Sequence, residues 1–402
     1  MDYSETLDYL YSRLPMYQRQ GKSAYKADLN NTIALLEALD NPQNKFKSIH
    51  IAGTNGKGTS AHAIAAILQT AGYKTGLYTS PHLKEFTERI RIDADEISKK
   101  WVVEFVEVLT PVIEAINPSF FEVTVAMAFQ YFADTEVDIA VIETGLGGRL
   151  DSTNVITPEV CLITNIGLDH TDLLGDTIEK IAAEKAGIIK KNVPVVIGDM
   201  HANALAVMKK VADKEGSPLI ETQPVWVEHE IPYFTRNTAG IMGVIGELRK
   251  QGWSISKDAE LEGLRNFTSI TNLKGRYQRL GKAPIVIADV SHNRDGLFIL
   301  IDYIKSQTFN KLHVVFGTVK DKNLRPIFDI LPREGCYYFT QSAVPRSLAA
   351  EDLRQQAANY GIEGEAYANV NEAMKAALFL ANSEDIVLVT GSTFVVAEID
   401  NL

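Results

Sequence analysis

The chain has 402 residues, 46% of them hydrophobic, and a formal net charge of −11. This length exceeds what one hydrophobic core usually serves and predicts two domains. The negative charge argues against a nucleic-acid partner, because binding a phosphate backbone requires clustered lysine and arginine, and no such run occurs. A basic leader and an apolar stretch of about 18 residues are also missing, so we expect a cytoplasmic protein with no membrane partner.

The two cysteines constrain the environment further. Cys161 and Cys336 lie far apart and have no neighbours at metal-ligand spacing. This usage predicts a reducing compartment, no structural zinc, and two thiols in the core.

The chain begins with two short predicted helices within residues 3–40. The polar stretch between them, residues 18–23, is either a plain connection or a mobile flap.

Residues 48–59 predict a phosphate-binding loop. Ile49 and Ile51 alternate in a strand that breaks into glycines and continues as a helix with apolar residues at helical spacing. The glycines let backbone N–H groups face phosphate oxygens, Lys57 supplies positive charge, and Thr59 can reach Mg²⁺. The loop residues are Gly53, Thr54, Asn55, Gly56, Lys57, Gly58 and Thr59. The spacing departs from the generic G-x-x-x-x-G-K-[ST] pattern, and the alternative is a tight strand-to-helix turn.

Three further predicted strands end in polar residues that suit metal binding. These strands span 75–79, 137–142 and 160–166. Ser80 follows the first, Glu143 the second and, after a short turn, His170 the third. Ligands of open α/β sheets lie at the carboxyl ends of strands, and a carboxylate beside glycines is a candidate metal ligand. We therefore expect these residues to share one rim with Lys57 and Thr59 as a Mg-nucleotide site.

Helical patterns fill the spaces between these strands. They cover 98–116 and 120–134, and a further helix ends near Lys185. A lysine in a last helical turn can be no more than a favourable charge. The Phe120-Phe121 pair favours core packing over a ligand platform. Residues 217–260 carry little signal and are expected to complete the first domain.

A boundary is predicted in the short polar stretch between Asn272 and Gly275, giving domains of residues 1–272 and 276–402. The first is predicted to hold a P-loop-containing, mostly parallel doubly wound α/β sheet, and the second to be a smaller Rossmann-like α/β domain. The strands of the second span 285–290, 312–316, 336–340 and 386–390, and its helices 295–306, 323–331, 349–360 and 371–381. Its first strand ends in the run 289–293, which we expect to face the nucleotide site across a cleft.

Seven motifs in a fixed order carry a family resemblance. They read G-T-N-G-K-G-T, T-S-P-H-L, E-T-G-L-G-G-R-L-D-S-T-N, L-D-H-T-D-L-L-G, A-E-K-A-G-I-I-K, K-G-R-Y-Q and D-V-S-H-N. Together they resemble the folylpolyglutamate synthase/dihydrofolate synthase family of the Mur ligase superfamily, whose shortened phosphate loop also matches. The resemblance implies a Mur ligase-like central domain that binds ATP and folate, followed by a ligase domain on the glutamate side.

The resemblance assigns roles at the phosphates and metals. Lys57 and the loop amides would hold the phosphates of ATP. The implied ligands of two Mg²⁺ ions are Thr59, Ser80, Glu143 and His170. Lys185 matches the lysine that is carbamylated in this family, where the new anion helps the second metal bind. K⁺ is a further candidate cofactor.

The resemblance also assigns contacts with the substrates. The nucleotide would meet Asn237 at the adenine, Asp289 at the ribose, Arg276 at the γ-phosphate, and Asn293. His292 and Ser392 would lie toward L-glutamate. Folate would lie near Phe121, Thr124, Arg149 and Asp151, between walls formed by residues 18–28 and by residues 80–89, which include His82 and Arg89. The expected catalytic residues are Lys57, His170, Lys185, Arg276 and His292.

The residues themselves suit phosphoryl transfer from ATP to a bound acid, because the site combines metals and lysine without a nucleophilic Ser, Cys or Lys arrangement. The family implies that dihydropteroate or a reduced folate is the acid and that L-glutamate attacks its acyl phosphate. Closure of the second domain would keep water away. We expect a monomer whose partners are these small molecules and ATP.

Three alternatives stay open. A sister ligase acting on a UDP-muramoyl peptide would use the same site, and Gly58 with the G-G-R-L-D-S-T-N run disfavours it. A non-ligase P-loop ATPase or kinase would leave Lys185 and the second domain unexplained. A non-enzymatic, nucleotide-dependent switch or scaffold would need no acid substrate.

Overall fold

The computed structural model describes residues 1–402 except 17–27, 224, 226–228, 230 and 232. It forms two compact units, one of residues 1–228 and 234–273 and one of residues 229–233 and 274–402. We expected residues 217–260 to complete the first domain, and for 229–233 this was wrong. The cause is visible at Tyr233, whose hydroxyl donates to Asp289 Oδ2 at 2.8 Å within the second unit.

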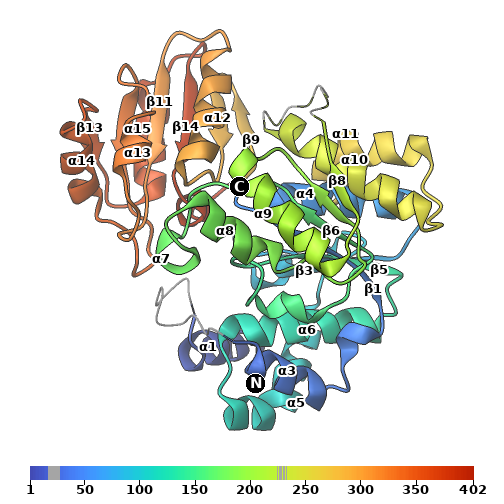
Figure 1. The fold of residues 1–402 in the computed structure, drawn as a ribbon. Helices are drawn as coiled ribbons and strands as arrows, with labels where there is room; N and C mark the ends of the chain where they lie inside the picture. Colours follow the sequence, from blue (N-terminus) through green and yellow to red (C-terminus); the bar gives the residue numbers. More distant parts are fainter. Residues whose placement is uncertain (17–27, 224, 226–228, 230, 232) are drawn as a thin grey trace. The chain divides into compact units, whose positions relative to one another are not determined.

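The first unit is built on an eight-stranded sheet of order β4-β3-β2-β5-β1-β6-β7-β8 (Figure 1). The strands are β1 Lys47–Ala52, β2 Thr75–Tyr78, β3 Ile90–Ile92, β4 Asp95–Glu96, β5 Ile139–Glu143, β6 Val160–Ile163, β7 Val195–Ile197 and β8 Leu219–Glu221. Among the strands that the structure describes in this unit, only β3 and β4 run antiparallel to their neighbours. The predicted mostly parallel, doubly wound sheet is therefore confirmed, and β3, β4 and β8 are additions too short to leave a sequence pattern.

Helices cover both faces of this sheet. They are α1 Tyr3–Arg13, α3 Asn30–Ala38, α4 Lys57–Thr70, α5 Lys99–Ile116, α6 Phe120–Asp134, α7 Thr171–Leu174, α8 Ile178–Ala186, α9 Ala202–Glu215, α10 Phe234–Lys250 and α11 Lys257–Ile270, with 3₁₀ turns η2 Pro42–Asn44, η3 Phe86–Arg89 and η4 Ser152–Val155. Local chemistry sets their ends: Ser119 and Glu122 form a capping box that starts α6, and Asn117 ends α5 in the left-handed conformation.

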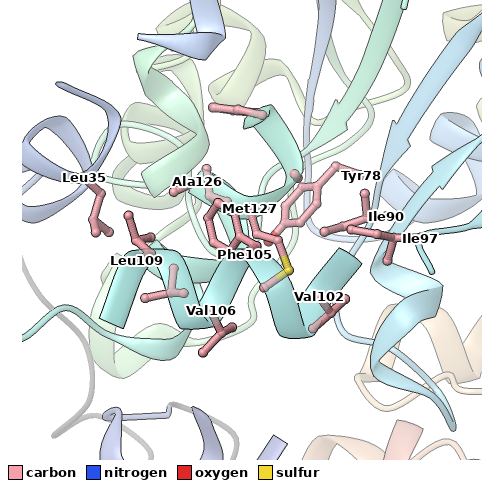
Figure 2. Packing of buried hydrophobic residues seen from close by; sticks show 14 of the residues in the cluster. Leu35, Tyr78, Ile90, Ile97, Val102, Phe105, Val106, Leu109, Ala126 and Met127 are labelled. Atoms are coloured by element: carbon pink, nitrogen blue, oxygen red, sulfur yellow. The ribbon is translucent and has the colours of Figure 1, made fainter. Parts of the chain in front are cut away.

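Apolar contacts hold α5 and α6 against the β2–β5 side of the sheet. Figure 2 shows part of this cluster, including Tyr78 of β2, Met127 of α6 and Phe105 of α5. A second cluster joins α8 and α9 to β6 and β7. Along β1, Ile49 and Ile51 point to the opposite face from His50, as the two-residue period of a strand requires. This packing fixes the carboxyl ends of β1, β5 and β6 beside one another.

The second unit contains a six-stranded sheet of order β13-β12-β11-β14-β10-β9 (Figure 1). Its elements are β9 Gln278–Lys282, β10 Ile285–Ala288, α12 Arg294–Lys305, β11 Leu312–Phe316, α13 Arg325–Phe328, β12 Cys336–Phe339, α14 Ala350–Ala358, β13 Gly364–Ala366, α15 Val370–Leu380, β14 Ile386–Thr390 and α16 Thr393–Ala397. All the described strand pairs of this unit except β9–β10 are parallel. The predicted α/β alternation is confirmed, while α13 is shorter than expected.

The two cysteines differ in burial. Cys161 is buried in β6, as predicted, whereas Cys336 is exposed. The expectation of two core thiols was wrong for Cys336, because this residue opens β12 before the strand enters the core. Across the described ranges, no helix combines the length and apolar character needed to cross a membrane.

Candidate active site

The phosphate-binding loop joins β1 to α4 and depends on two glycines. A Cβ on Gly53 would lie 1.9 Å from Thr164 Oγ1. Gly56, with φ of 81°, is the left-handed residue before α4, and a Cβ there would lie 2.3 Å from Asn237 Oδ1. Only glycine fits both positions. The predicted adenine ligand Asn237 is thus packed from α10 directly against the loop.

Two residues that the sequence analysis missed brace this loop. Thr54 N donates to Asn165 O at 3.0 Å and Asn55 N to Asn165 Oδ1 at 2.9 Å. Asn55 O accepts from Thr164 Oγ1 at 2.7 Å and from Asn165 Nδ2 at 2.8 Å. No pattern marked their role: the predicted strand 160–166 included both, whereas β6 ends at Ile163 and both residues follow it.

Two lysines converge on the carbonyl oxygen of Gly53. Lys57 Nζ donates to it at 3.1 Å, and Lys185 Nζ, from the last turn of α8, donates at 2.8 Å. Lys185 is only 4% exposed. Burial first, and then the charge of Lys57, lower the pKa of Lys185 to about 7, against the opposing effects of Asp169 and Asp151. A solvated lysine that only complements the helix end is therefore ruled out.

The predicted metal ligands lie at neighbouring strand ends. Ser80 N donates to Glu143 Oε2 at 3.2 Å, which brings the ends of β2 and β5 together. Glu143 is buried, and so is Thr59, which lies in the first turn of α4. His170 precedes α7 with φ of 49°, and its Nε2 lies 3.9 Å from Asp169 Oδ2. Within the described residues, no group of three His, Cys, Asp or Glu side chains could hold a metal ion by itself.

Asp151 and Arg149 occupy the glycine-rich turn after β5. Asp151 is buried and accepts from Leu146 N at 2.8 Å, from Thr153 N at 3.0 Å and from Thr153 Oγ1 at 2.5 Å. Burial raises the pKa of this carboxyl, and the hydrogen bonds act in the opposite direction. The Arg149 guanidinium pairs with Glu184 Oε1 at 2.8 Å. Both predicted folate contacts therefore serve the protein's own hydrogen bonding.

The other predicted folate contacts gather around Tyr78 and Phe121. The Phe121 ring lies against Gly145, where a Cβ would be 2.4 Å from Cζ, and its centroid is 6.2 Å from that of Tyr78. Thr124 Oγ1 donates to Phe121 O at 2.9 Å. The aromatic ring thus packs on the turn that follows Glu143, instead of only filling the core.

His82 and Arg89 form a pair in the segment after β2. Arg89 is 1% exposed, and its Nε donates to His82 Nδ1 at 2.7 Å. Burial, with a smaller effect of Arg89, holds the pKa of His82 well below its usual value. His82 is therefore neutral, with its proton on Nε2.

In the second unit, Asp289 organises the end of β10. It is 0% exposed and accepts from Tyr233 Oη at 2.8 Å, Tyr277 N at 2.7 Å and Ser291 N at 2.8 Å. Its carboxylate already has three donors.

Of the other predicted residues of the second unit, His292 and Asn293 follow β10, Ser392 follows β14, and Arg276 precedes β9. Asn293 caps α12 by accepting from Gly296 N at 2.9 Å, and Ser392 caps α16 by accepting from Phe394 N at 3.1 Å. His292 Nδ1 lies 3.1 Å from Val290 O, and Arg276 is half-buried.

Comparison with known protein families agrees with this arrangement. Residues 51–222 match the Mur ligase middle domain, and residues 275–393 match the Mur ligase glutamate ligase domain. A P-loop sheet followed by a second α/β unit thus defines the chain as an ATP-dependent ligase of the Mur type.

Individual relatives narrow the class. Folylpolyglutamate synthase of Lacticaseibacillus casei is 34% identical over 82% of this chain and 83% of its own, and dihydrofolate synthase/folylpolyglutamate synthase of Bacillus subtilis is 32% identical over 99% of this chain and 98% of its own. The chain belongs to the folylpolyglutamate synthase/dihydrofolate synthase family. This membership confirms the resemblance and sets aside the kinase and scaffold alternatives.

Solved structures show the same fold. Folylpolyglutamate synthase of Mycobacterium tuberculosis, complexed with ADP and AMPPCP, has a TM-score of 0.87 at 28% identity and covers 98% of both chains. A bifunctional folylpolyglutamate synthase/dihydrofolate synthase with Mn, AMPPNP and L-glutamate bound has a TM-score of 0.85 at 29% identity and covers 99% of this chain and 97% of its own.

Proposed function

We propose that this protein uses ATP to join L-glutamate to the carboxylate of dihydropteroate or of a reduced folate, through an acyl phosphate. The observation that carries the proposal is the convergence of Lys57 and Lys185 on Gly53 O, beside a Glu143 that accepts from Ser80 N. Cationic and acidic side chains thereby meet at one phosphate-binding loop. That combination suits a nucleotide with divalent metal better than a simple structural turn.

The residues at the strand ends fit Mg²⁺ by their chemistry. The hydroxyls of Thr59 and Ser80, the carboxylate of Glu143 and the imidazole of His170 would hold two ions, with nucleotide oxygens completing their shells. Glu143 is buried at the end of β5, so a bound cation would offset the cost of burying its charge. Bound Mg²⁺ would neutralise the charge of the transferring phosphoryl group.

The environment of Lys185 supports carbamylation. Only a neutral amine attacks CO₂, and a pKa of about 7 leaves a large neutral fraction near neutral pH. The product would turn a buried cation into an anion beside Lys57. The amine also sits at a fixed point, since it donates to Gly53 O.

The protein's own residues would then act by positioning and by charge. Lys57 would stabilise the γ-phosphoryl group as it moves to the substrate carboxylate, and the amino group of L-glutamate would displace phosphate to form the amide. Arg276 and His292 of the second unit are the proposed residues for the γ-phosphate and for glutamate. The Phe121 ring on Gly145 is the proposed contact for the folate.

A phosphate-release assay tests the proposal. The enzyme is given ATP and L-glutamate with dihydropteroate, tetrahydrofolate or a UDP-muramoyl peptide in turn. We expect release that requires glutamate and one of the two pterin substrates. Release with the muramoyl peptide alone, or release that ignores every acid, would contradict the assignment.

A further inference from the structure

The 3₁₀ turn η4 contacts both the glycine-rich turn that follows Glu143 and the end of α8, which carries Lys185. The function proposed above makes no use of the η4 residues Thr153 and Asn154. Asn154 lies at the end of the D-S-T-N motif and is buried. Its Nδ2 donates to Arg149 O at 3.0 Å and to Gly187 O at 2.9 Å. One side-chain amide therefore ties the glycine-rich turn after β5 to the residue that ends α8.

Other contacts make this junction tight. Arg149 N donates to Glu184 O at 2.7 Å. A Cβ on Gly187 would lie 2.4 Å from Arg149 Cα, and a Cβ on Gly148 would lie 2.8 Å from Glu184 O. The two segments thus touch backbone to backbone, and only glycines allow that distance.

Lys190, the last residue of the A-E-K-A-G-I-I-K motif, completes the junction. Its Nζ donates to Asn154 O at 2.8 Å. The residues of this junction, called the clamp below, are Arg149, Asn154, Gly187 and Lys190.

Buried hydrogen bonds between His50, Thr153 and Asp151 also hold η4 in place. Thr153 Oγ1 gives its only proton to Asp151 Oδ1, so the hydroxyl accepts from His50 Nε2 at 2.8 Å. Burial lowers the pKa of His50 to about 3, so this ring stays neutral. Thr153, the neighbour of the clamp residue Asn154, is therefore held in place by buried hydrogen bonds.

We propose that Asn154 is a positioning residue for Lys185: by joining the glycine-rich turn to the end of α8, it holds the Lys185 amine on Gly53 O, where carbamylation places the new anion. This inference rests on the proposed carbamylation. Lys185 is two residues from Gly187, so movement of the helix end moves the amine. Groups that orient a metal-binding side chain typically change affinity or activity by about 10–100-fold when removed.

The test compares Asn154→Leu, which keeps the approximate volume and removes both donors, with Lys190→Met and Lys190→Arg. Carbamate on Lys185 is measured by ¹³C NMR with ¹³C-bicarbonate, without nucleotide or metal. We expect Asn154→Leu to need about 10-fold more bicarbonate for half-occupancy. Lys190→Met should show a smaller increase in the bicarbonate concentration at half-occupancy, and Lys190→Arg should keep the wild-type concentration. Asn266→Leu is the control, because the native Asn266 side chain donates within its own helix, to Glu262.

Hydrogen exchange separates positioning from general loosening. In Asn154→Leu we expect faster exchange at residues 145–150 and 184–188 and unchanged exchange in α4 and α9. Unchanged bicarbonate dependence in a folded Asn154→Leu protein, or faster exchange across the whole first unit, would overturn the inference. A wild-type protein with no carbamate resonance would overturn the carbamylation instead, and the exchange pattern alone would then decide whether the clamp exists.

Discussion

At the scale of single residues, Glu143 is the most direct test of the metal assignment. Glu143→Gln keeps the side-chain volume and the acceptor for Ser80 N but removes the charge, so the fold should persist while turnover falls by about 10²–10³-fold. Steady-state turnover and a thermal unfolding curve measure both parts. Glu104→Gln, on an exposed surface of α5, is the control. Turnover near the wild-type rate at ordinary Mg²⁺ would refute the assignment.

Lys185 predicts a pH dependence of stability. Its pKa is about 7 in the folded chain against 10.5 for an ordinary lysine, so the unfolded chain binds the extra proton between these values. The stability of the wild type should therefore rise with pH across this window, and the full penalty of burying the lysine applies below pH 7. Lys185→Met removes the group. In CO₂-free buffer, the gain in stability of Lys185→Met over the wild type should be largest below pH 7 and shrink toward pH 10.

Denaturant midpoints at several pH values measure this difference. Lys191→Met, at an exposed lysine, is the matched control. The difference in its denaturant midpoint from the wild type should not change with pH. A Lys185→Met difference that is equally flat would mean that Lys185 keeps its ordinary pKa in the folded protein.

At the scale of elements, the loop after β6 supports the phosphate-binding loop. Asn165→Ala removes the side-chain hydrogen bonds to Asn55 N and Asn55 O. Each such bond contributes about 1 kcal/mol, so we expect the KM for ATP to rise by about 10-fold with a smaller change in turnover. Steady-state kinetics against ATP concentration test this, with Asn266→Ala as control. An unchanged KM for ATP would show that the loop keeps its conformation without this support.

At the scale of the whole molecule, the prediction concerns the contribution of the second unit to catalysis. Arg276 is the residue proposed for the γ-phosphate, so Arg276→Ala should lower turnover by about 10²–10³-fold and weaken ATP binding much less. Turnover and ATP binding by calorimetry are compared with those of Arg325→Ala, an exposed arginine of the same unit. Equal losses in both variants, or intact turnover, would remove Arg276 from the mechanism.

The sequence by itself determined where the main strands lie and which candidate site residues follow them. Mostly apolar runs that end in polar or glycine-rich turns predicted β1, β5, β6 and β10, because a parallel sheet buries both faces of such strands. Polar residues directly after such runs, including Ser80, Glu143 and Asp289, could be identified because strand ends in these sheets meet at one edge. The short strands β3, β4 and β8 could not, since two or three residues carry no period.

Only the tertiary structure decided what surrounds each of these residues. Lys185 was equally compatible with a solvated helix end until its burial and its bond to Gly53 O, 132 residues away along the chain, were seen. No sequence pattern predicted the roles of Thr164, Asn165 and Asn154, because these roles are hydrogen bonds to backbone groups of other segments. Sequence patterns record the periodicity of one element, whereas burial, partners and pKa depend on which elements pack together.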